Sequence, residues 1–178
     1  EEMGHGTGGY FRIGNKYFIL TAAHVVDTKH KLVVSDCNEL VNLKVVYADF
    51  KNDVALLVPS RPLHKVRSRK WRVNTSDNLL GEVLIYSGYP SQLGRVLVNG
   101  MVSSHTTEGI IMQSFALPGS SGSVVFDKAG RVVGVISAVA LHQSPFSPYP
   151  EMQENMVFVS RVEHLDHYLI REVLECGE

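Results

Sequence analysis

Short apolar runs, separated by turn-forming residues at close spacing, make up most of this chain. Each run is rich in Val, Ile, Tyr or Phe and is bounded by Gly, Asn, Asp or Pro, a pattern typical of β-strands and their turns. The predicted strands cover residues 17–20, 31–34, 43–47, 54–58, 83–86, 95–99, 110–113, 123–126, 132–140 and 156–159. Because no helical segments alternate with these runs, the pattern predicts antiparallel barrels or sandwiches rather than a parallel sheet.

Two local signals refine this all-β prediction. The segment 127–130 separates two strands and is expected to form a hairpin loop with Gly130 at positive φ. Ser160 and Glu163 have the spacing of a capping box, which predicts the start of a C-terminal helix that packs on a barrel. The apolar face of this helix repeats at helical spacing over Val162, Leu165, Leu169, Ile170, Val173 and Leu174.

His164 and His167 lie three residues apart in this predicted helix, a spacing that suits a metal. A zinc site needs at least a third protein ligand, and none is evident nearby. We therefore interpret the two histidines as part of a solvated helix face and expect no metal.

The composition excludes several classes of protein. The chain has 178 residues, with 44% hydrophobic and 20% charged residues, which is a globular composition. Seventeen basic and 18 acidic residues give a formal net charge of −1, which argues against nucleic-acid binding driven by global charge. The longest apolar run, 132–141, is interrupted by Gly134 and Ser137 and is too short to span a membrane.

The segment 61–72 carries six Lys or Arg residues and no acidic residue. It is interpreted as a solvated surface connection between a first domain, residues 1–68, and a second, residues 69–178. A local contact with RNA or acidic lipid headgroups is the alternative. The two cysteines, Cys37 and Cys176, do not form a disulfide framework, and we expect both thiols to be unpaired.

Three short motifs carry candidate chemistry. His24 follows a predicted strand in Thr-Ala-Ala-His, Asp53 opens the apolar run Asp-Val-Ala-Leu-Leu, and Ser121 lies in the small-residue turn Gly-Ser-Ser-Gly-Ser. A serine hydroxyl needs a base to take its proton, and imidazole suits that role near neutral pH. A carboxylate on the other ring nitrogen fixes the tautomer, and the backbone N–H groups of Gly119 and Ser121 are placed to form an oxyanion hole.

These motifs, in the order His, Asp, Ser on an all-β chain, resemble those of the trypsin/chymotrypsin-like serine peptidases. The resemblance extends from Gly6-Thr7-Gly8 to the C-terminal helix. It implies two antiparallel six-stranded β-barrels, with His24 and Asp53 in the first barrel and Ser121 in the second. It also implies a serine endopeptidase that forms an acyl-enzyme, acts on a polypeptide substrate and needs no cofactor.

Departures from the family pattern narrow this interpretation. Digestive members place Asp before the nucleophile, where this chain has Ser120, so the ion pair that completes their oxyanion hole cannot form. The chain looks more like HtrA-type peptidases and viral polyprotein-processing peptidases, and its compactness favours the viral group. A viral peptidase of this kind would be located in the host cytoplasm. An HtrA-like quality-control peptidase is the alternative, and an inactive barrel that serves as a binding module is a third.

The family alignment also predicts a substrate pocket. Its expected lining is Phe115, Ala116, Ile136, Ser137, Val139 and Met156. Such an apolar, crowded pocket discriminates by size, which predicts a small or aliphatic residue before the scissile bond. The alternative is that His105 or His142 enters the pocket and selects an acidic residue.

Overall fold

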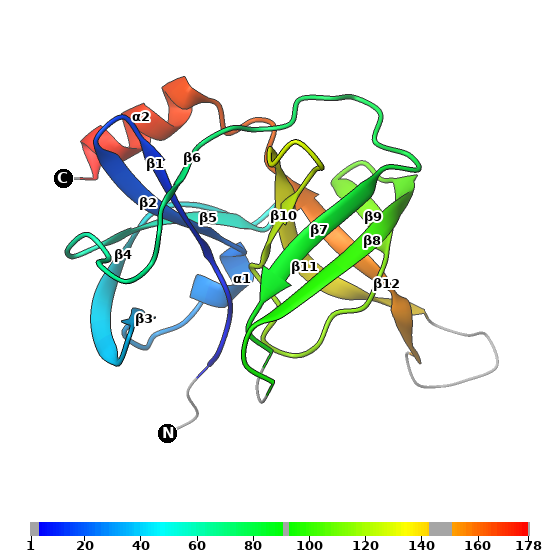
Figure 1. Cartoon of the computed structure of the whole chain (residues 1–178), viewed down its shortest axis with the longest axis horizontal. Helices are drawn as coiled ribbons and strands as arrows, with labels where there is room; N and C mark the ends of the chain where they lie inside the picture. Colours follow the sequence, from blue (N-terminus) through cyan, green and yellow to red (C-terminus); the bar gives the residue numbers. More distant parts are fainter. Residues whose placement is uncertain (1–3, 91–92, 143–150, 178) are drawn as a thin grey trace.

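A computed structural model describes residues 4–90, 93–142 and 151–177 of the chain. The chain is mostly β, with two six-stranded sheets and two helices (Figure 1). The elements are β1 Gly9–Ile13, β2 Lys16–Thr21, α1 Ala23–Val26, β3 Val33–Asp36, β4 Glu39–Asp49, β5 Val54–Pro59, β6 Arg69–Lys70, β7 Val83–Gly88, β8 Val96–His105, β9 Gly109–Gln113, β10 Val124–Phe126, β11 Val132–His142, β12 Glu151–Arg161 and α2 His167–Cys176.

The N-terminal half forms one sheet with the strand order β3-β4-β5-β2-β1-β6. Its neighbouring strands are antiparallel except at one edge, where β6 pairs in parallel with β1 through Phe11 and Arg69. The pattern of apolar runs did not predict β1 or β6, because β1 is interrupted by Arg12 and β6 has only two residues, both basic. The two residues of β6, just after the predicted domain boundary at residue 68, pair with this sheet, and the boundary itself stays a prediction.

The C-terminal half is a closed barrel with the strand order β10-β11-β12-β9-β8-β7. The β10–β11 hairpin closes as predicted, with Gly130 at a φ of 75°. The Asp127 carbonyl accepts a hydrogen bond from the Gly130 N–H at 3.0 Å. The expected second barrel is thus closed, whereas the edge strands β3 and β6 of the N-terminal sheet do not pair with each other.

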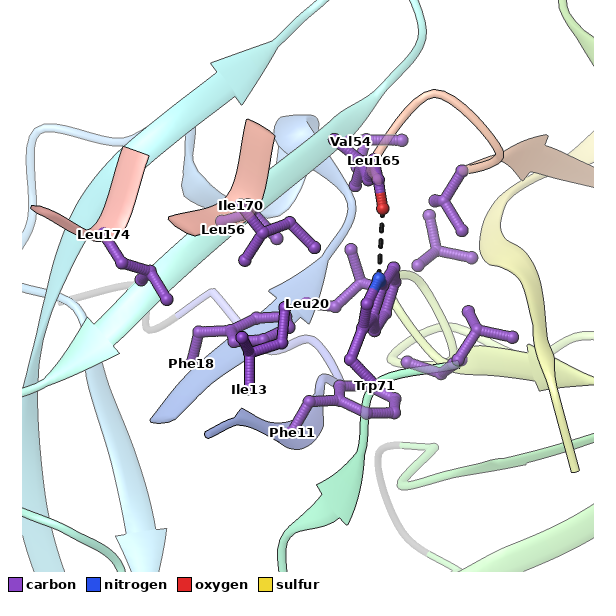
Figure 2. Packing of buried hydrophobic residues seen from close by; sticks show 14 of the residues in the cluster. Phe11, Ile13, Phe18, Leu20, Val54, Leu56, Trp71, Leu165, Ile170 and Leu174 are labelled. Atoms are coloured by element: carbon purple, nitrogen blue, oxygen red, sulfur yellow. Dashed lines mark hydrogen bonds between the residues drawn. The ribbon is translucent and has the colours of Figure 1, made fainter. Parts of the chain in front are cut away.

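A core of aromatic residues joins the two halves. Trp71 is fully buried and packs edge-on against Phe11 and Phe18 (Figure 2). Its indole N–H donates to the Leu165 carbonyl at 3.0 Å, so the one polar atom of this side chain is satisfied. Because the same cluster includes Val132 and Val135 of the barrel, it connects both sheets and the C-terminal segment.

The helix α2 begins later than the capping box predicted. Ser160 is buried inside β12, where it pairs with Gly109, and Glu163 forms an ion pair with Arg161. The predicted cap was wrong because pairing with β9 and β11 extends β12 through residue 161. Asp166 caps the helix instead, since its carboxylate accepts the Leu169 N–H at 2.8 Å.

The predicted apolar face is confirmed in part. Ile170 and Leu174 of α2 are buried in the core, as are Val162 and Leu165 of the segment before it. The helix covers the N-terminal sheet beside β4, at the far side from the closed barrel (Figure 1). Within the described part of the chain, no helix is long and apolar enough to cross a membrane. Cys37 and Cys176 are both exposed and free.

Candidate active site

His24 lies where β2 ends and the single turn of α1 begins. Its backbone N–H donates to Oδ1 of Asp53 at 2.8 Å, and its Nδ1 lies 2.8 Å from Oδ2 of the same carboxylate. The carboxylate thus contacts both the backbone and the ring of His24, which fixes the rotamer of the imidazole. The His24 side chain is 48% exposed and that of Asp53 is 19% exposed, so the ring remains open to solvent and to a substrate.

A tight turn before β5 places Asp53. Asp53 has a φ of 53°, in the left-handed region that is uncommon for residues other than glycine. The preceding turn is tied by Asp49, whose carboxylate accepts the backbone N–H groups of Lys51 and Asn52, each at 3.0 Å. Burial acts to raise the pKa of Asp49, but the hydrogen bonds from Asn52 and Lys51 outweigh it and hold that pKa below its usual value. The charged Asp49 therefore stabilises the turn that presents Asp53.

The carboxylate of Asp53 has a further partner in the barrel. The Ser137 hydroxyl donates to Oδ2 of Asp53. Ser137 lies at an irregularity of β11, where the register with β12 shifts between Ile136 and Ala138. This bulge directs the hydroxyl of Ser137 toward the N-terminal half of the chain.

The loop that carries Ser121 is held by glycines and by the segment before β1. Gly119 and Gly122 have φ values of 95° and 84°, which residues with a Cβ rarely adopt. A Cβ on Gly122 would overlap the hydroxyl of Thr21 and the carbonyl of Thr7, so no larger residue fits there. The Thr7 N–H donates to the Ser121 carbonyl at 2.9 Å, which connects the loop to the N-terminal half.

Ser120, the residue before Ser121, is 1% exposed and contributes a hydrogen bond within the same loop. Its hydroxyl accepts the backbone N–H of Leu117 at 3.3 Å. The phenol of Tyr86 donates to the carbonyl of Phe115, and burial raises the pKa of Tyr86 to about 12. Neutral hydrogen bonds thus fix the segment 115–120, one of them to Tyr86 of β7.

The residues predicted for the substrate pocket occupy different environments. Phe115 is 49% exposed, Ala116 packs against the barrel core and Met156 is half-buried. Ile136 is only 1% exposed and belongs to the barrel core, while Ser137 contacts Asp53. The side chain of Val139 lies outside the described residues, so the pocket lining stays a prediction.

Two of the remaining histidines lie away from the Ser121 loop. His105 accepts the Leu79 N–H at 3.2 Å and lines a surface hollow of about 270 Å³. His164 lines the same hollow and lies 4.0 Å from the Asp49 carboxylate, whereas His167 is the first residue of α2. The side chain of His142 lies outside the described residues.

The basic segment 61–72 is exposed over most of its length. Arg61 is engaged, since it bridges Asp36 and Glu39, and Arg69 stacks over the Phe126 ring at 4.8 Å. The other cations, Lys65, Arg67, Lys70 and Arg72, are exposed, and an anionic partner for them stays a prediction.

The sequence of this chain is similar to those of known peptidases. Residues 6–135 match the profile of the trypsin-like peptidase domain. The chain belongs to this family. It is 33% identical over 151 residues to a probable periplasmic serine endoprotease DegP-like of Ectopseudomonas mendocina, covering 78% of this chain and 31% of that protein. It is 32% identical over 154 residues to the serine protease Do-like HtrA of Bacillus subtilis, covering 76% of this chain and 34% of that protein. The chain thus spans about a third of the length of these relatives.

Solved structures of this family show the same fold. The HtrA-type protease AlgW with a decapeptide superposes with a TM-score of 0.70 at 21% identity, over 97% of this chain and 52% of that one. The serine endoprotease from Yersinia pestis also gives a TM-score of 0.70, at 19% identity, over 97% of this chain and 58% of that one.

Two polar residues of this trypsin-like domain make contacts that the sequence did not indicate. Thr7 was noted only as part of Gly6-Thr7-Gly8, and Ser137 was placed in the pocket. The bonds of Ser137 to Asp53 and of Thr7 to the Ser121 loop join residues distant in sequence, so no local pattern could reveal them.

Proposed function

We propose that this chain is a serine endopeptidase domain in which Ser121 is the nucleophile, His24 the general base and Asp53 the residue that orients His24. The observation that carries the proposal is the pairing of His24 with Asp53 through both the ring nitrogen and the backbone N–H. The bond from Thr7 to the Ser121 carbonyl adds support, because it connects the serine loop to the half that carries His24.

The residues perform the reaction as follows. Nδ1–H of His24 donates to Asp53, which leaves Nε2 free to take the proton of the Ser121 hydroxyl as its oxygen attacks the substrate carbonyl. The N–H groups of Gly119 and Ser121 stabilise the oxyanion that forms. His24 then gives the proton to the leaving amine as the C–N bond breaks. In the second half of the reaction His24 takes a proton from water as the water attacks the acyl-enzyme, and it gives that proton to the Ser121 oxygen as the ester C–O bond breaks and the acid product leaves.

The similarity favours an HtrA-type peptidase over a viral polyprotein-processing enzyme. The relatives from Ectopseudomonas mendocina and Bacillus subtilis and the structure from Yersinia pestis are bacterial, and a further relative, Protease Do-like 1 of Arabidopsis thaliana, is chloroplastic and 28% identical over 151 residues. The compactness of the chain, which favoured the viral interpretation, does not outweigh these similarities. We therefore assign the chain to HtrA-like peptidases that act on polypeptides.

The experiment is labelling with a fluorophosphonate, which reports an activated serine without knowledge of the substrate. Wild-type protein is expected to be labelled, whereas Ser121→Ala and His24→Ala are not. Ser123→Ala is the matched control, because the Ser123 hydroxyl has no hydrogen-bond partner among the described residues, and it should retain the label. If the folded wild-type protein is not labelled, the chain is an inactive barrel that serves as a binding module.

For the substrate, we propose a small or aliphatic residue before the scissile bond. The exposed Phe115 and half-buried Met156 support this proposal, since neither supplies a charge to pair with Arg, Lys or Glu. A peptide library should show cleavage after Ala, Val or Leu, and Met156→Ala should extend the preference toward larger side chains. Preference for Glu that is lost in His105→Ala or His142→Ala would contradict the proposal.

A further inference from the structure

Thr7 makes four hydrogen bonds that meet beside the Ser121 loop. Its backbone N–H donates to the Ser121 carbonyl at 2.9 Å, and its carbonyl accepts the Thr21 hydroxyl at 2.7 Å. Its own hydroxyl donates to the Gly119 carbonyl at 2.8 Å and accepts the Tyr89 N–H at 3.1 Å. Since Thr7 is only 7% exposed, water competes poorly for these bonds.

The two hydrogen bonds of the Thr7 hydroxyl determine where its hydrogen points. A threonine hydroxyl has one hydrogen to donate, and the N–H of Tyr89 has no lone pair to accept it. The hydrogen must therefore point to the Gly119 carbonyl. Tyr89 thus orients the Thr7 hydroxyl, and the hydroxyl in turn holds the peptide unit that follows Gly119.

This peptide unit lies between the two units that carry the Gly119 and Ser121 N–H groups, and it needs such an anchor. Gly119 has a φ of 95°, and glycine crosses between positive and negative φ at little cost, so its own torsional preferences do not fix the loop. An oxyanion hole requires N–H groups that are aligned before the substrate binds. Ser120 has no carboxylate that could anchor the loop by an ion pair, and its hydroxyl accepts the Leu117 N–H within the loop.

We infer that Thr7 is a positioning residue whose side-chain hydroxyl keeps the N–H groups of Gly119 and Ser121 aligned for catalysis. This inference rests on the proposed function of Ser121. The two bonds to the loop act together: the hydroxyl holds the Gly119 carbonyl, and the backbone N–H holds the Ser121 carbonyl two residues later. Loss of the hydroxyl frees the first of these carbonyls and leaves the second bond in place.

The test compares Thr7→Val, which keeps the shape and removes the hydroxyl, with Thr7→Ser, which keeps the hydroxyl. Thr28→Val is the matched control, because the Thr28 hydroxyl accepts the His30 N–H two residues later at 3.1 Å. We expect kcat of Thr7→Val to fall at least tenfold, up to the loss of about 10²–10³ known for removal of one oxyanion donor, with KM within about threefold. Thr7→Ser and Thr28→Val should retain kcat within about threefold of wild type.

A second measurement reports the conformation of the Ser121 loop and does not depend on activity. In protein labelled with ¹⁵N-glycine, the amide resonance of Gly119 should move in Thr7→Val and stay in place in Thr7→Ser and Thr28→Val. If Thr7→Val does not fold, Thr7→Ala replaces it, since Ala removes the hydroxyl without placing a methyl group against Gly119 and Tyr89.

The outcomes separate this inference from the function on which it rests. If wild type is labelled by fluorophosphonate and a folded Thr7→Val retains full kcat, the inference is wrong and the proposed function stands. An equal loss of kcat in Thr7→Ser would also overturn it, because the hydroxyl is then not the cause. If wild type is not labelled, the proposed function fails, and the Gly119 resonance alone decides whether Thr7 positions the loop.

Discussion

Ser137 donates its hydroxyl hydrogen to Oδ2 of Asp53, the carboxylate oxygen that also lies 2.8 Å from Nδ1 of His24. The two residues come from different halves of the chain, Ser137 from the closed barrel and Asp53 from the turn before β5. Each bond to a carboxylate oxygen restricts its rotation. The orientation of the His24 ring therefore depends on how the two halves pack against each other.

Ser137→Ala should lower kcat/KM about tenfold and leave the fold intact, because Asp53 keeps His24 as a partner but loses one restraint on its rotation. Steady-state kinetics and thermal unfolding of the purified variant measure both effects. Ser104→Ala is the control, since that hydroxyl donates to the adjacent His105 carbonyl at 3.2 Å. Unchanged kinetics in Ser137→Ala would show that His24 and the turn before β5 fix Asp53 without help from the barrel.

Asp53→Asn should reduce kcat by about 10⁴, the loss known for a triad carboxylate replaced by an amide, because the amide favours the wrong tautomer of His24. The unfolding temperature should change little, since Asn also tolerates the φ of 53° at this position. Asp77→Asn, at an exposed position, is the comparison. Activity above a tenth of wild type in Asp53→Asn would remove Asp53 from the proposed triad.

Stability should fall in acid through Asp36. The His64 N–H donates to Asp36 at 2.9 Å and the Arg61 guanidinium at 3.0 Å, and together they hold the pKa of Asp36 below its usual 3.8 although burial opposes them. Since the folded pKa is depressed, this contribution is complete above pH 3.8 and is lost as the pH falls through the lower folded value.

The measurement is the unfolding temperature of wild type and Asp36→Asn from about pH 6 to about pH 2. Asp36→Asn should be less stable at the upper end and should lose less stability on acidification. Asp49 and Asp127 also have lowered pKa values, so the unfolding temperature of the variant should still fall somewhat as the pH is lowered. Parallel curves for the two proteins would contradict the assignment.

Tyr86 should limit stability in alkali. Burial raises its pKa from 10.0 to about 12, while a hydrogen bond with Ser120 acts in the opposite direction. Because the folded state retains the proton more tightly, its contribution is complete below pH 10 and is lost as the pH rises through about 12. Tyr86→Phe should flatten the stability curve over this interval, at a cost of about 1 kcal/mol near neutral pH for the lost bond to Phe115. Tyr168→Phe, 77% exposed, should behave like wild type.

Ser123→Ala should be neutral or stabilising by up to about 1 kcal/mol, since it removes a buried hydroxyl that lacks a partner. Ser123 is fully buried, and its Oγ has no hydrogen-bond partner among the described residues. Urea unfolding measures the change. Ser160→Ala, at another buried serine, gives a comparison in β12. A clear loss of stability in Ser123→Ala would show that its hydroxyl is satisfied in solution.

The sequence by itself determined the strands, turns and motifs that depend on residues close together in the chain. Short runs rich in Val, Ile, Tyr and Phe, bounded by turn-forming residues, predicted ten of the strands, and the turn at 127–130 followed from the suitability of Gly130 for positive φ. The motifs around His24, Asp53 and Ser121 were visible for the same reason, since each depends on a short turn beside a strand.

Tertiary structure decided what depends on partners distant in sequence. The capping-box pattern at Ser160 and Glu163 is a valid local signal, yet pairing with β9 and β11 keeps Ser160 in a strand, because a buried strand edge must satisfy its backbone groups. The local sequence pattern did not indicate the bulge of β11, which directs the Ser137 hydroxyl toward Asp53. Thr7 reaches Gly119 across 112 residues. A single hydroxyl can bond many partners, and only the packing of the two halves against each other selects this one.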